Sequence, residues 1–294
     1  MRSLLFVPGD SQKKLEKALA TDADALLIDL EDSVSLQSKT EARQITSAFL
    51  SEHRNKVGRP RFYVRVNGLT TGMTDVDLDG IMQAAPDGIV LPKTVGGADV
   101  TLLSAKLAVR EAGFGLVDGS TRILAIATEN AAGLFALGTF AGASDRLTGL
   151  AWGGEDLSAD LGAETNRGDD GAYTDPYRLA RSLTLLGAAV AGVDAVDAVF
   201  TNFRDTVGLK EECRMARRDG FVAKMAIHPA QVPVINEAFT PSAEAVEKAR
   251  QVIEAFETNK GAGVVAVDGE MLDRPHLLRA ERLLAGLAAS NGPQ

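Results

Sequence analysis

Short β-rich runs alternate with longer helical patterns along most of this sequence, and each type of segment has its own hydrophobic spacing. Eight runs fit strands, at residues 3–9, 25–32, 61–68, 88–94, 121–130, 147–157, 195–202 and 221–228. Because a helical pattern follows each strand candidate, the order predicts parallel βαβ units.

The helical patterns lie at residues 38–54, 76–85, 98–113 and 131–142, with others beginning at Ser11 and near Pro176. Pro176 suits a helix start, where its missing N–H leaves no hydrogen bond unmade. Residues 162–173 are polar and rich in glycine, so we expect a mobile loop near a functional site.

Eight consecutive βα units predict an α/β fold of the (β/α)8 TIM-barrel type over residues 1–240. The uninterrupted apolar run at 25–28 fits a strand that is buried on both faces. An open, doubly wound sheet is the competing architecture. Residues 241–294 exceed what a barrel requires, and they predict a C-terminal helical and hairpin extension. Its parts are a helix at 245–258, a turn at 260–263, a short strand at 264–268 and a helix from Pro275.

The composition is that of an ordinary soluble globular protein, with 294 residues, 45% hydrophobic and 24% charged. The net charge of −9 argues against nucleic acid as a partner, since such binding needs a basic face. The single cysteine, Cys213, excludes an intramolecular disulfide and fits a reducing compartment. Without a secretory pattern or an apolar run long enough for a bilayer, we expect a cytoplasmic protein with no membrane partner.

Polar residues end almost every predicted strand, and in a β/α barrel such residues meet at the same rim. They are Pro8, Gly9, Asp10, Asp29, Glu31, Asp32, Arg65, Asn67, Lys93, Glu129, Glu155, Asp156, Asn202 and His228. Residues scattered along the chain are therefore expected to converge on one site.

Glu129 and Asp156 end neighbouring predicted strands, which lie about 4.8 Å apart in a sheet. Two carboxylates at that spacing can bind one hard cation, and such a site suits Mg²⁺, with Mn²⁺ as the alternative. The competing interpretation is that both residues form salt bridges at the rim.

Arg65 lies inside an apolar strand, on the opposite face from Val64 and Val66. A guanidinium that points into a barrel must be paired or functional, and its shape suits a carboxylate or a developing enolate oxygen. The competing interpretation is a structural partner for Glu31 or Asp32, and the two are compatible. Lys93 could form a Schiff base or an ion pair with the acids, and His228 could cap and pack or contact substrate.

Taken in order, these segments resemble one family. RSLLFVPG at 2–9, DLEDSV at 29–34, RVN at 65–67, LPK at 91–93, Glu129, GGEDL at 153–157, KMAIHP at 224–229 and DGEMLD at 268–273 follow the pattern of the citrate lyase β-subunit-like group within the HpcH/HpaI aldolase superfamily. The resemblance covers essentially the whole chain. One departure is the stretch from Ala127 to Asn130, which replaces a common Ile-Glu-Thr but retains the glutamate.

The resemblance implies a barrel that forms homo-oligomers, commonly trimers, with Mg²⁺ on Glu129 and Asp156 and with Arg65 at the substrate carbonyl or enolate. The C-terminal segment of a neighbouring subunit would close the site and supply an acid/base aspartate, Asp273, with Asp268 as the alternative. Glu31 and Asp32 complete the catalytic candidates, and the substrate-binding candidates are Pro8, Arg65, Lys93, Glu129, Gly154, Glu155 and His228.

The activity that the resemblance implies is cleavage or formation of a 3-hydroxyacyl-CoA thioester, such as malyl-, citramalyl- or citryl-CoA, with acetyl-CoA and a 2-oxoacid as the fragments. The alternatives are a citrate lyase β-subunit that acts on a citryl-acyl-carrier protein, and a malyl-CoA thioesterase. A non-catalytic binding barrel is the reading from another class, and the charged rim argues against it.

Overall fold

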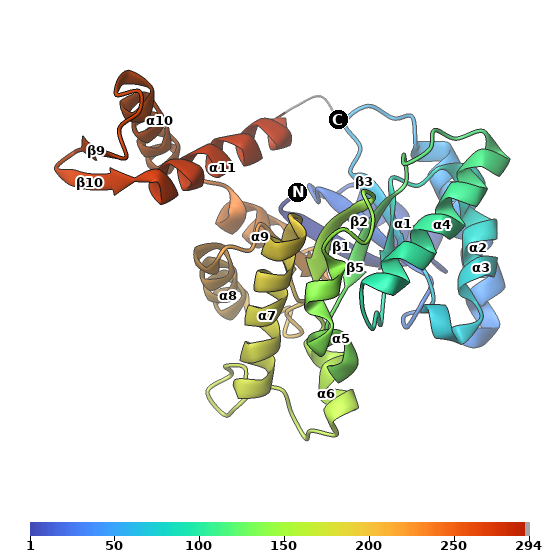
Figure 1. Ribbon diagram of the computed structural model, residues 1–294. Coiled ribbons are helices and arrows are strands. Elements are labelled where there is room, and N and C mark those ends of the chain that lie inside the picture. The colour runs from blue at the N-terminus through green and yellow to red at the C-terminus, as the bar shows by residue number, and fades with distance from the viewer. Residues whose placement is uncertain (292–294) are drawn as a thin grey trace. The chain divides into compact units, whose positions relative to one another are not determined.

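The computed structural model describes residues 1–291 and confirms the predicted fold. Eight parallel strands close into a barrel in the order β1 to β8, with β1 paired to β8, and helices surround the strands (Figure 1). The chain divides into two compact units, Met1–Phe239 and Thr240–Gln294, and the barrel forms the first unit.

The barrel strands are β1 (Ser3–Pro8), β2 (Ala25–Asp29), β3 (Arg61–Arg65), β4 (Gly88–Leu91), β5 (Arg122–Ile126), β6 (Leu147–Ala151), β7 (Asp194–Asp197) and β8 (Ala223–Ala226). The α-helices of this unit are α1 (Gln12–Leu19), α2 (Lys39–His53), α3 (Thr74–Ile81), α4 (Gly97–Phe114), α5 (Ala131–Phe135), α6 (Gly154–Leu161), α7 (Asp175–Ala191), α8 (Thr206–Asp219) and α9 (Gln231–Phe239). Short 3-10 turns are η1 (Leu36–Ser38), η2 (Leu69–Thr71), η3 (Met82–Ala84) and η4 (Leu137–Phe140).

Alternate residues of each strand pack on opposite sides of the barrel wall. Ala25, Leu27 and Tyr63 belong to the cluster inside the barrel, whereas Leu26 and Phe62 belong to the larger cluster between strands and helices. Because the side-chain period of a strand is two, Asp29 and Arg65 lie on the inner side with Leu27 and Tyr63. The inward direction predicted for Arg65 is therefore what the fold produces.

Several predicted segments differ from the structure, and the stretch after Leu147 bears most on the site. The strand expected over 147–157 ends at Ala151, and α6 begins at Gly154, so Asp156 lies in the first turn of a helix and does not end a strand. The Gly153–Gly154 pair separates the two elements, and the apolar Leu157 that suggested a longer strand packs on the core from the helix. The helix expected over 131–142 is divided into α5 and η4.

The second unit contains α10 (Ala243–Thr258), an antiparallel hairpin of β9 (Val264–Val267) and β10 (Glu270–Asp273), and α11 (Arg274–Asn291) (Figure 1). Its small core joins Ala249 and Val252 of α10 to Val265, Leu272 and Ala280. The predicted helical and hairpin extension is thus a helix–hairpin–helix, in which β10 is the second strand of the hairpin. In the described part of the chain, no helix combines the length and the apolar character that crossing a bilayer demands.

Candidate active site

Asp29 and Arg65 form a buried ion pair at the rim. The parallel register places the two residues side by side at the ends of β2 and β3. Arg65 donates from Nε to Asp29 Oδ1 at 2.7 Å and from Nη2 to Asp29 Oδ2 at 2.7 Å. Asp29 also accepts from the backbone N–H groups of Glu31 and Ser33 at 2.9 and 3.0 Å, so the turn after β2 is tied to the same carboxylate.

The pairing holds both side chains charged. Burial alone would raise the pKa of Asp29, but the hydrogen-bonded guanidinium outweighs it and the pKa lies below its usual value. Burial would lower the pKa of Arg65, yet Asp29 and Glu31 together raise it. The Arg65 guanidinium also lies 4.7 Å over the ring of Phe6, which fixes the plane of the fork.

Glu31 is buried beside this pair, and one of its carboxylate oxygens accepts no hydrogen bond. Its Oε2 lies 3.0 Å from Arg65 Nη1, but it makes no hydrogen bond. Its Oε1 lies 2.8 Å from the ammonium of Lys93. Burial raises the pKa of Glu31 above its ordinary value, although Arg65 and Lys93 oppose that shift.

Lys93 lies between the acids that follow β2, Glu31 and Asp32, and Asp156 at the start of α6. Its Nζ donates to Asp32 at 2.9 and 3.0 Å and lies 3.6 Å from Asp156 Oδ1. Burial would lower the pKa of Lys93, but its hydrogen bonds to Glu31 and Asp32 raise it, so the side chain is an ammonium ion at neutral pH. The ion-pair reading is therefore supported, whereas Schiff-base formation needs a neutral amine.

Glu129 follows β5 and is buried at the rim. Its Oε2 accepts the backbone N–H of Lys93, which adopts a left-handed conformation with φ of 54°. Burial raises the pKa of Glu129 to about 8, with further increases from Asp156 and Glu31 that the Lys93 N–H opposes. Gly153 makes room for this side chain, because a Cβ there would lie 2.6 Å from Glu129 Cγ.

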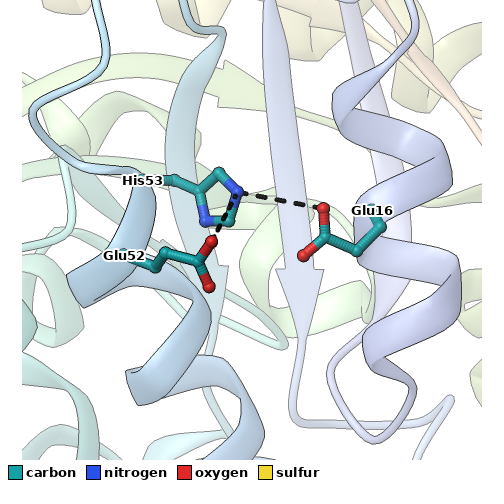
Figure 2. A group of neighbouring side chains, drawn as sticks. All are labelled: Glu16, Glu52 and His53. Carbon is teal, nitrogen blue, oxygen red and sulfur yellow. Dashed lines mark ion pairs between the residues drawn. The ribbon is translucent and has the colours of Figure 1, made fainter.

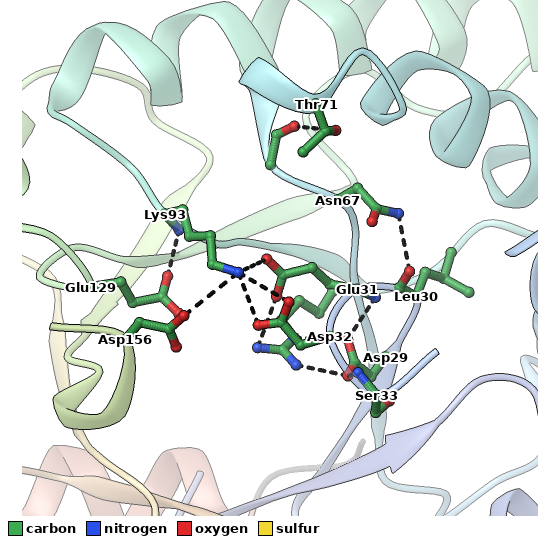
Figure 3. A network of polar contacts seen from close by, with 12 residues as sticks. Asp29, Leu30, Glu31, Asp32, Ser33, Asn67, Thr71, Lys93, Glu129 and Asp156 are labelled. Carbon is green, nitrogen blue, oxygen red and sulfur yellow. Dashed lines mark hydrogen bonds and ion pairs between the residues drawn. The ribbon is translucent and has the colours of Figure 1, made fainter. Parts of the chain in front are cut away.

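Asp156 and Glu155 occupy the first turn of α6, where the positive end of the helix dipole favours carboxylates. The Asp156 and Glu129 carboxylates lie side by side, on the other side of Lys93 from Glu31 and Asp32 (Figure 3). Glu155 accepts from Asn166 at 2.8 Å, which ties the 162–173 loop to the helix start. The two residues predicted to hold a cation thus come together even though they belong to a strand end and a helix start.

The charges and donor atoms of the rim fit a divalent cation. Five carboxylates face three cationic side chains, Lys39, Arg65 and Lys93, and Lys39 donates to the backbone carbonyls of Leu30 and Glu31 at 2.6 Å. The carboxylates of this set are Asp29, Glu31, Asp32, Glu129 and Asp156. With all five carboxylates ionised, the negative charge exceeds the positive charge by two, which one ion of charge +2 would balance. The all-oxygen donor set suits Mg²⁺.

The sequence matches the model of a known protein family over most of its length. The model of the family described as HpcH/HpaI aldolase/citrate lyase matches residues 2–229. The chain belongs to this family. Membership confirms the resemblance seen in the sequence and the predicted enzyme class, a carbon–carbon lyase.

Two curated relatives and a solved structure show how far the likeness to this aldolase/citrate lyase family extends. The chain is 35% identical over 285 residues to the citrate lyase subunit beta of Leuconostoc mesenteroides subsp. cremoris, covering 96% of this chain and 92% of the relative. It is 35% identical to a (3S)-malyl-CoA thioesterase of Cereibacter sphaeroides, covering 97% and 93%. The crystal structure of protein CitE from Mycobacterium tuberculosis in complex with magnesium, acetoacetate and coenzyme A matches with a TM-score of 0.76 and 35% identity, covering 97% of both chains.

Other predicted site residues lie outside the ion-pair network of the rim. Pro8 ends β1 in register with Asp29. The His228 ring stacks on Phe203, with ring centroids 4.5 Å apart, and its Nδ1 accepts from the Ala230 N–H at 3.1 Å, so its contacts fit the capping and packing interpretation. Asp273 and Asp268 belong to the second unit, where Asp273 is exposed and pairs with His276.

A second acidic cluster lies outside the barrel, on α1 and α2 (Figure 2). The Nδ1 of the buried His53 lies 2.9 Å from the Phe49 carbonyl, and its Nε2 lies 3.8 Å from carboxylate oxygens of both Glu16 and Glu52. These contacts fit a histidine held between two exposed acids, and they join no part of the rim.

Lys39 and Asp77 are not among the predicted site residues, whereas Asp29 was predicted only as a strand end at the rim and Gly153 only as part of the GGEDL segment. The pairing of Asp29 with Arg65 follows from the parallel register, which places the two residues side by side. Asp77 accepts from Asn67 at 2.7 Å and pairs with Arg43, so it supports the turn after β3 from α3. No sequence signal distinguishes such a supporting acid from a solvated one.

Proposed function

We propose that this chain is a Mg²⁺-dependent carbon–carbon lyase that cleaves a 3-hydroxyacyl-CoA thioester into acetyl-CoA and a 2-oxoacid. The observation that carries the proposal is the pair of carboxylates, Glu129 and Asp156, whose charges act on each other at the rim, together with the inward guanidinium of Arg65, which interacts electrostatically with Glu129. Family membership and the likeness to a CitE structure that holds magnesium and coenzyme A support it.

Glu129 and Asp156 are the residues that would hold the metal, and Mn²⁺ could replace Mg²⁺ because both ions take oxygen ligands. When bound, the ion would supply Lewis-acid polarisation of substrate oxygens and a template for their orientation. The raised pKa of Glu129 fits a ligand that is buried where a cation would restore its charged form.

Arg65 is placed to stabilise the enolate oxygen of the thioester fragment. Its Nε and Nη2 hold Asp29, whereas Nη1 makes no hydrogen bond to Glu31 and retains donor capacity for a substrate oxygen. The two hydrogen bonds to Asp29 and the stacking on Phe6 hold the guanidinium in position before substrate arrives. A donor that needs no reorganisation is the arrangement that stabilises developing charge best.

The proton transfers balance across two carboxyl groups. Glu31, with its raised pKa and its exposed neighbour Asp32, is the candidate base that takes the proton of the substrate hydroxyl as the carbon–carbon bond breaks. The electron pair of that bond passes to the thioester as an enolate, and the hydroxyl carbon becomes the carbonyl of the 2-oxoacid. Asp273 of a neighbouring copy then gives a proton to the enolate carbon, which completes acetyl-CoA.

The remaining rim residues, Pro8, Gly154, Glu155 and His228, would line the substrate-binding part of the site. We further propose a homo-oligomer, a trimer or a multiple of trimers, in the cytoplasm. The lining residues and the homo-oligomer rest on the resemblance to the family. The negative net charge of the chain supports the absence of a nucleic-acid partner.

Two alternative activities would use the same site. The likeness to a (3S)-malyl-CoA thioesterase supports hydrolysis of the thioester after cleavage, and the likeness to a citrate lyase subunit beta supports a thioester carried on an acyl carrier protein. Free CoA in the products would mark the first activity. Co-purification with a small acidic carrier protein would mark the second.

The test is a panel of malyl-, citramalyl- and citryl-CoA incubated with purified protein, with Mg²⁺ or with EDTA. We expect at least one thioester to release acetyl-CoA and a 2-oxoacid in equal amounts, and EDTA to stop the release. Cleavage that survives EDTA, or that continues unchanged in Glu129→Ala, would contradict the metal assignment.

A further inference from the structure

The ammonium group of Lys93 lies close to three carboxylates, so it has little donor capacity left for a substrate. Its ammonium lies 2.8 Å from Glu31, 2.9 Å from Asp32 and 3.6 Å from Asp156. An ammonium has three N–H donors, so these carboxylates can occupy all of them. The side chain is also positioned between the two groups of acids, with Glu129 and Asp156 on one side and Glu31 and Asp32 on the other (Figure 3).

We propose that Lys93 is the resident counter-cation of the rim, a positioning residue that holds Glu31 and Asp32 in place and weakens the affinity of Glu129 and Asp156 for the divalent ion. This inference rests on the proposed function, because it assumes that those two carboxylates bind the metal. It replaces the expectation that Lys93 contacts substrate.

The first step of the argument is that Asp156 is shared. The ammonium lies 3.6 Å from the oxygen of a carboxylate that would also bind the metal, so two cations would stand close together around one acid. Like charges at such a distance repel, and the repulsion is stronger where solvent is partly excluded. Lys93 is only 38% exposed, and Glu129 is buried.

The second step is that the backbone and side chain of Lys93 act on different acids. The backbone N–H, presented by the left-handed conformation, donates to Glu129. The side chain pairs with the other three carboxylates. Removing only the ammonium therefore leaves the orientation of Glu129 intact and isolates the electrostatic effect.

The third step separates this role from substrate binding. A lysine that binds a substrate carboxylate or the phosphates of CoA would not change the affinity for metal in the absence of substrate. A counter-cation would change it. Metal binding to the substrate-free protein is therefore the readout that a substrate contact would not move.

The experiment is a calorimetric titration of metal-free protein with Mg²⁺, repeated with Mn²⁺ and detected by electron paramagnetic resonance. The variants are Lys93→Met, which deletes the charge, and Lys93→Arg, which keeps it. Lys93→Gly is the second deletion, because glycine adopts the left-handed conformation without strain. The matched control is Lys106→Met, which removes the same charge from α4, where Lys106 pairs with Asp75 at 2.7 Å.

We expect Lys93→Met and Lys93→Gly to lower the dissociation constant for Mg²⁺ by roughly threefold to tenfold, as loss of a neighbouring like charge does. Lys93→Arg and Lys106→Met should stay within about twofold of the unsubstituted protein. With saturating metal, kcat of Lys93→Met should fall, because Glu31 and Asp32 lose the group that orients them.

An unchanged or raised dissociation constant in both charge-deletion variants would overturn the role of Lys93. Failure of the proposed function gives a different result, since the unsubstituted protein would then bind no Mg²⁺, or Glu129→Gln would bind it equally well. Circular dichroism of each variant separates these results from loss of the fold.

Discussion

At the scale of single residues, Arg65 shows how one buried side chain is made available for chemistry. The inner face of a barrel strand excludes water, so a guanidinium there must be paired. Asp29 holds two of its nitrogens at 2.7 Å and leaves the third turned toward Glu31 without a hydrogen bond. The pair therefore fixes the fork and still leaves a donor for substrate.

Replacing Arg65 tests this arrangement. Arg65→Lys keeps a positive charge beside Asp29 but loses the planar fork, and we expect kcat/KM for the cleaved thioester to fall by about 100-fold or more, equivalent to about 3 kcal/mol. Steady-state kinetics at saturating Mg²⁺ measures the loss, and Mg²⁺ titration serves as the control. Retention of nearly full activity would show that Arg65 is only a structural partner of Asp29.

The inward direction of Arg65 could be predicted from the sequence because a strand has a period of two. Its main partner could not. The sequence indicated Glu31 or Asp32 as the partner of Arg65, whereas the register places Asp29 opposite Arg65 and leaves Glu31 as the weaker contact. Choosing among three acids within four positions requires the register and the shape of the turn, and neither follows from residue type.

At the scale of elements, the site depends on how β5 and α6 approach each other. Glu129 follows β5, Gly153 precedes α6, and a Cβ on Gly153 would lie 2.6 Å from Glu129 Cγ. The absence of a side chain at this point lets the carboxylate of Glu129 lie beside that of Asp156.

We therefore expect Gly153→Ala to displace Glu129 and to weaken Mg²⁺ binding by about tenfold or more, since displaced ligand atoms lose coordination geometry. Calorimetric titration with Mg²⁺ measures the change. Gly138→Ala is the matched control, because a Cβ on Gly138 meets no atom within 4 Å. Equal affinities in the two variants would mean that Gly153 has no part in placing the ligand.

The opposite end of the barrel has its own buried ion pair. Glu111 of α4 lies 2.7 Å from Arg146 and accepts from the backbone N–H groups of Gly119 and Thr121 at 2.9 and 2.8 Å. Burial alone would raise the pKa of Glu111, but Arg146 and the backbone donors lower it to about 2. The ionised carboxylate thus links α4, the loop before β5 and the start of β6.

Because the pKa of Glu111 is lower in the folded state than its ordinary value near 4.5, its contribution to stability is complete above that value and is lost as pH falls toward about 2. Glu111→Gln should reduce the free energy of unfolding by about 2 kcal/mol at pH 7. Urea unfolding between pH 7 and 3 should show this difference shrinking below about pH 4.5. A difference that stays constant with pH would contradict the ion pair, and Glu237→Gln, at an exposed pair, is the control.

The order of the elements was predictable because eight strand patterns alternate with helices, and their C-terminal ends must share a rim. The start of α6 was not. The segment from Leu147 to Leu157 is apolar enough to suggest one strand, and only the packing of Leu157 on the core from a helix shows that the strand stops at Ala151. The two carboxylates predicted at the ends of neighbouring strands therefore come from the loop after β5 and from the first turn of α6.

At the scale of the whole molecule, the chain consists of a barrel and a separate helix–hairpin–helix unit. The barrel carries the acids, Arg65 and Lys93, whereas Asp268 and Asp273 belong to the second unit. In the proposed mechanism Asp273 supplies the acid, and the proposed homo-oligomer would bring this unit to the rim of a neighbouring copy.

Asp273→Asn should lower kcat for cleavage by about 100-fold or more while leaving Mg²⁺ binding unchanged, because it removes a proton donor and no metal ligand. Asp268→Asn is the comparison, since Asp268 lies in the same hairpin region and is the alternative acid. Sedimentation velocity gives the oligomeric state of both variants. If Asp273→Asn dissociates the oligomer and keeps its chemistry, the residue is structural.

The claim that the rest of the account depends on is that Glu129 and Asp156 bind one divalent ion. The most direct measurement is the anomalous difference density of a crystal grown with Mn²⁺. We predict a peak that touches both carboxylates at roughly the 2.0–2.3 Å expected for a hard cation bound by oxygen. A peak only at the outer cluster of Glu16, Glu52 and His53, or no density between Glu129 and Asp156, would contradict the account.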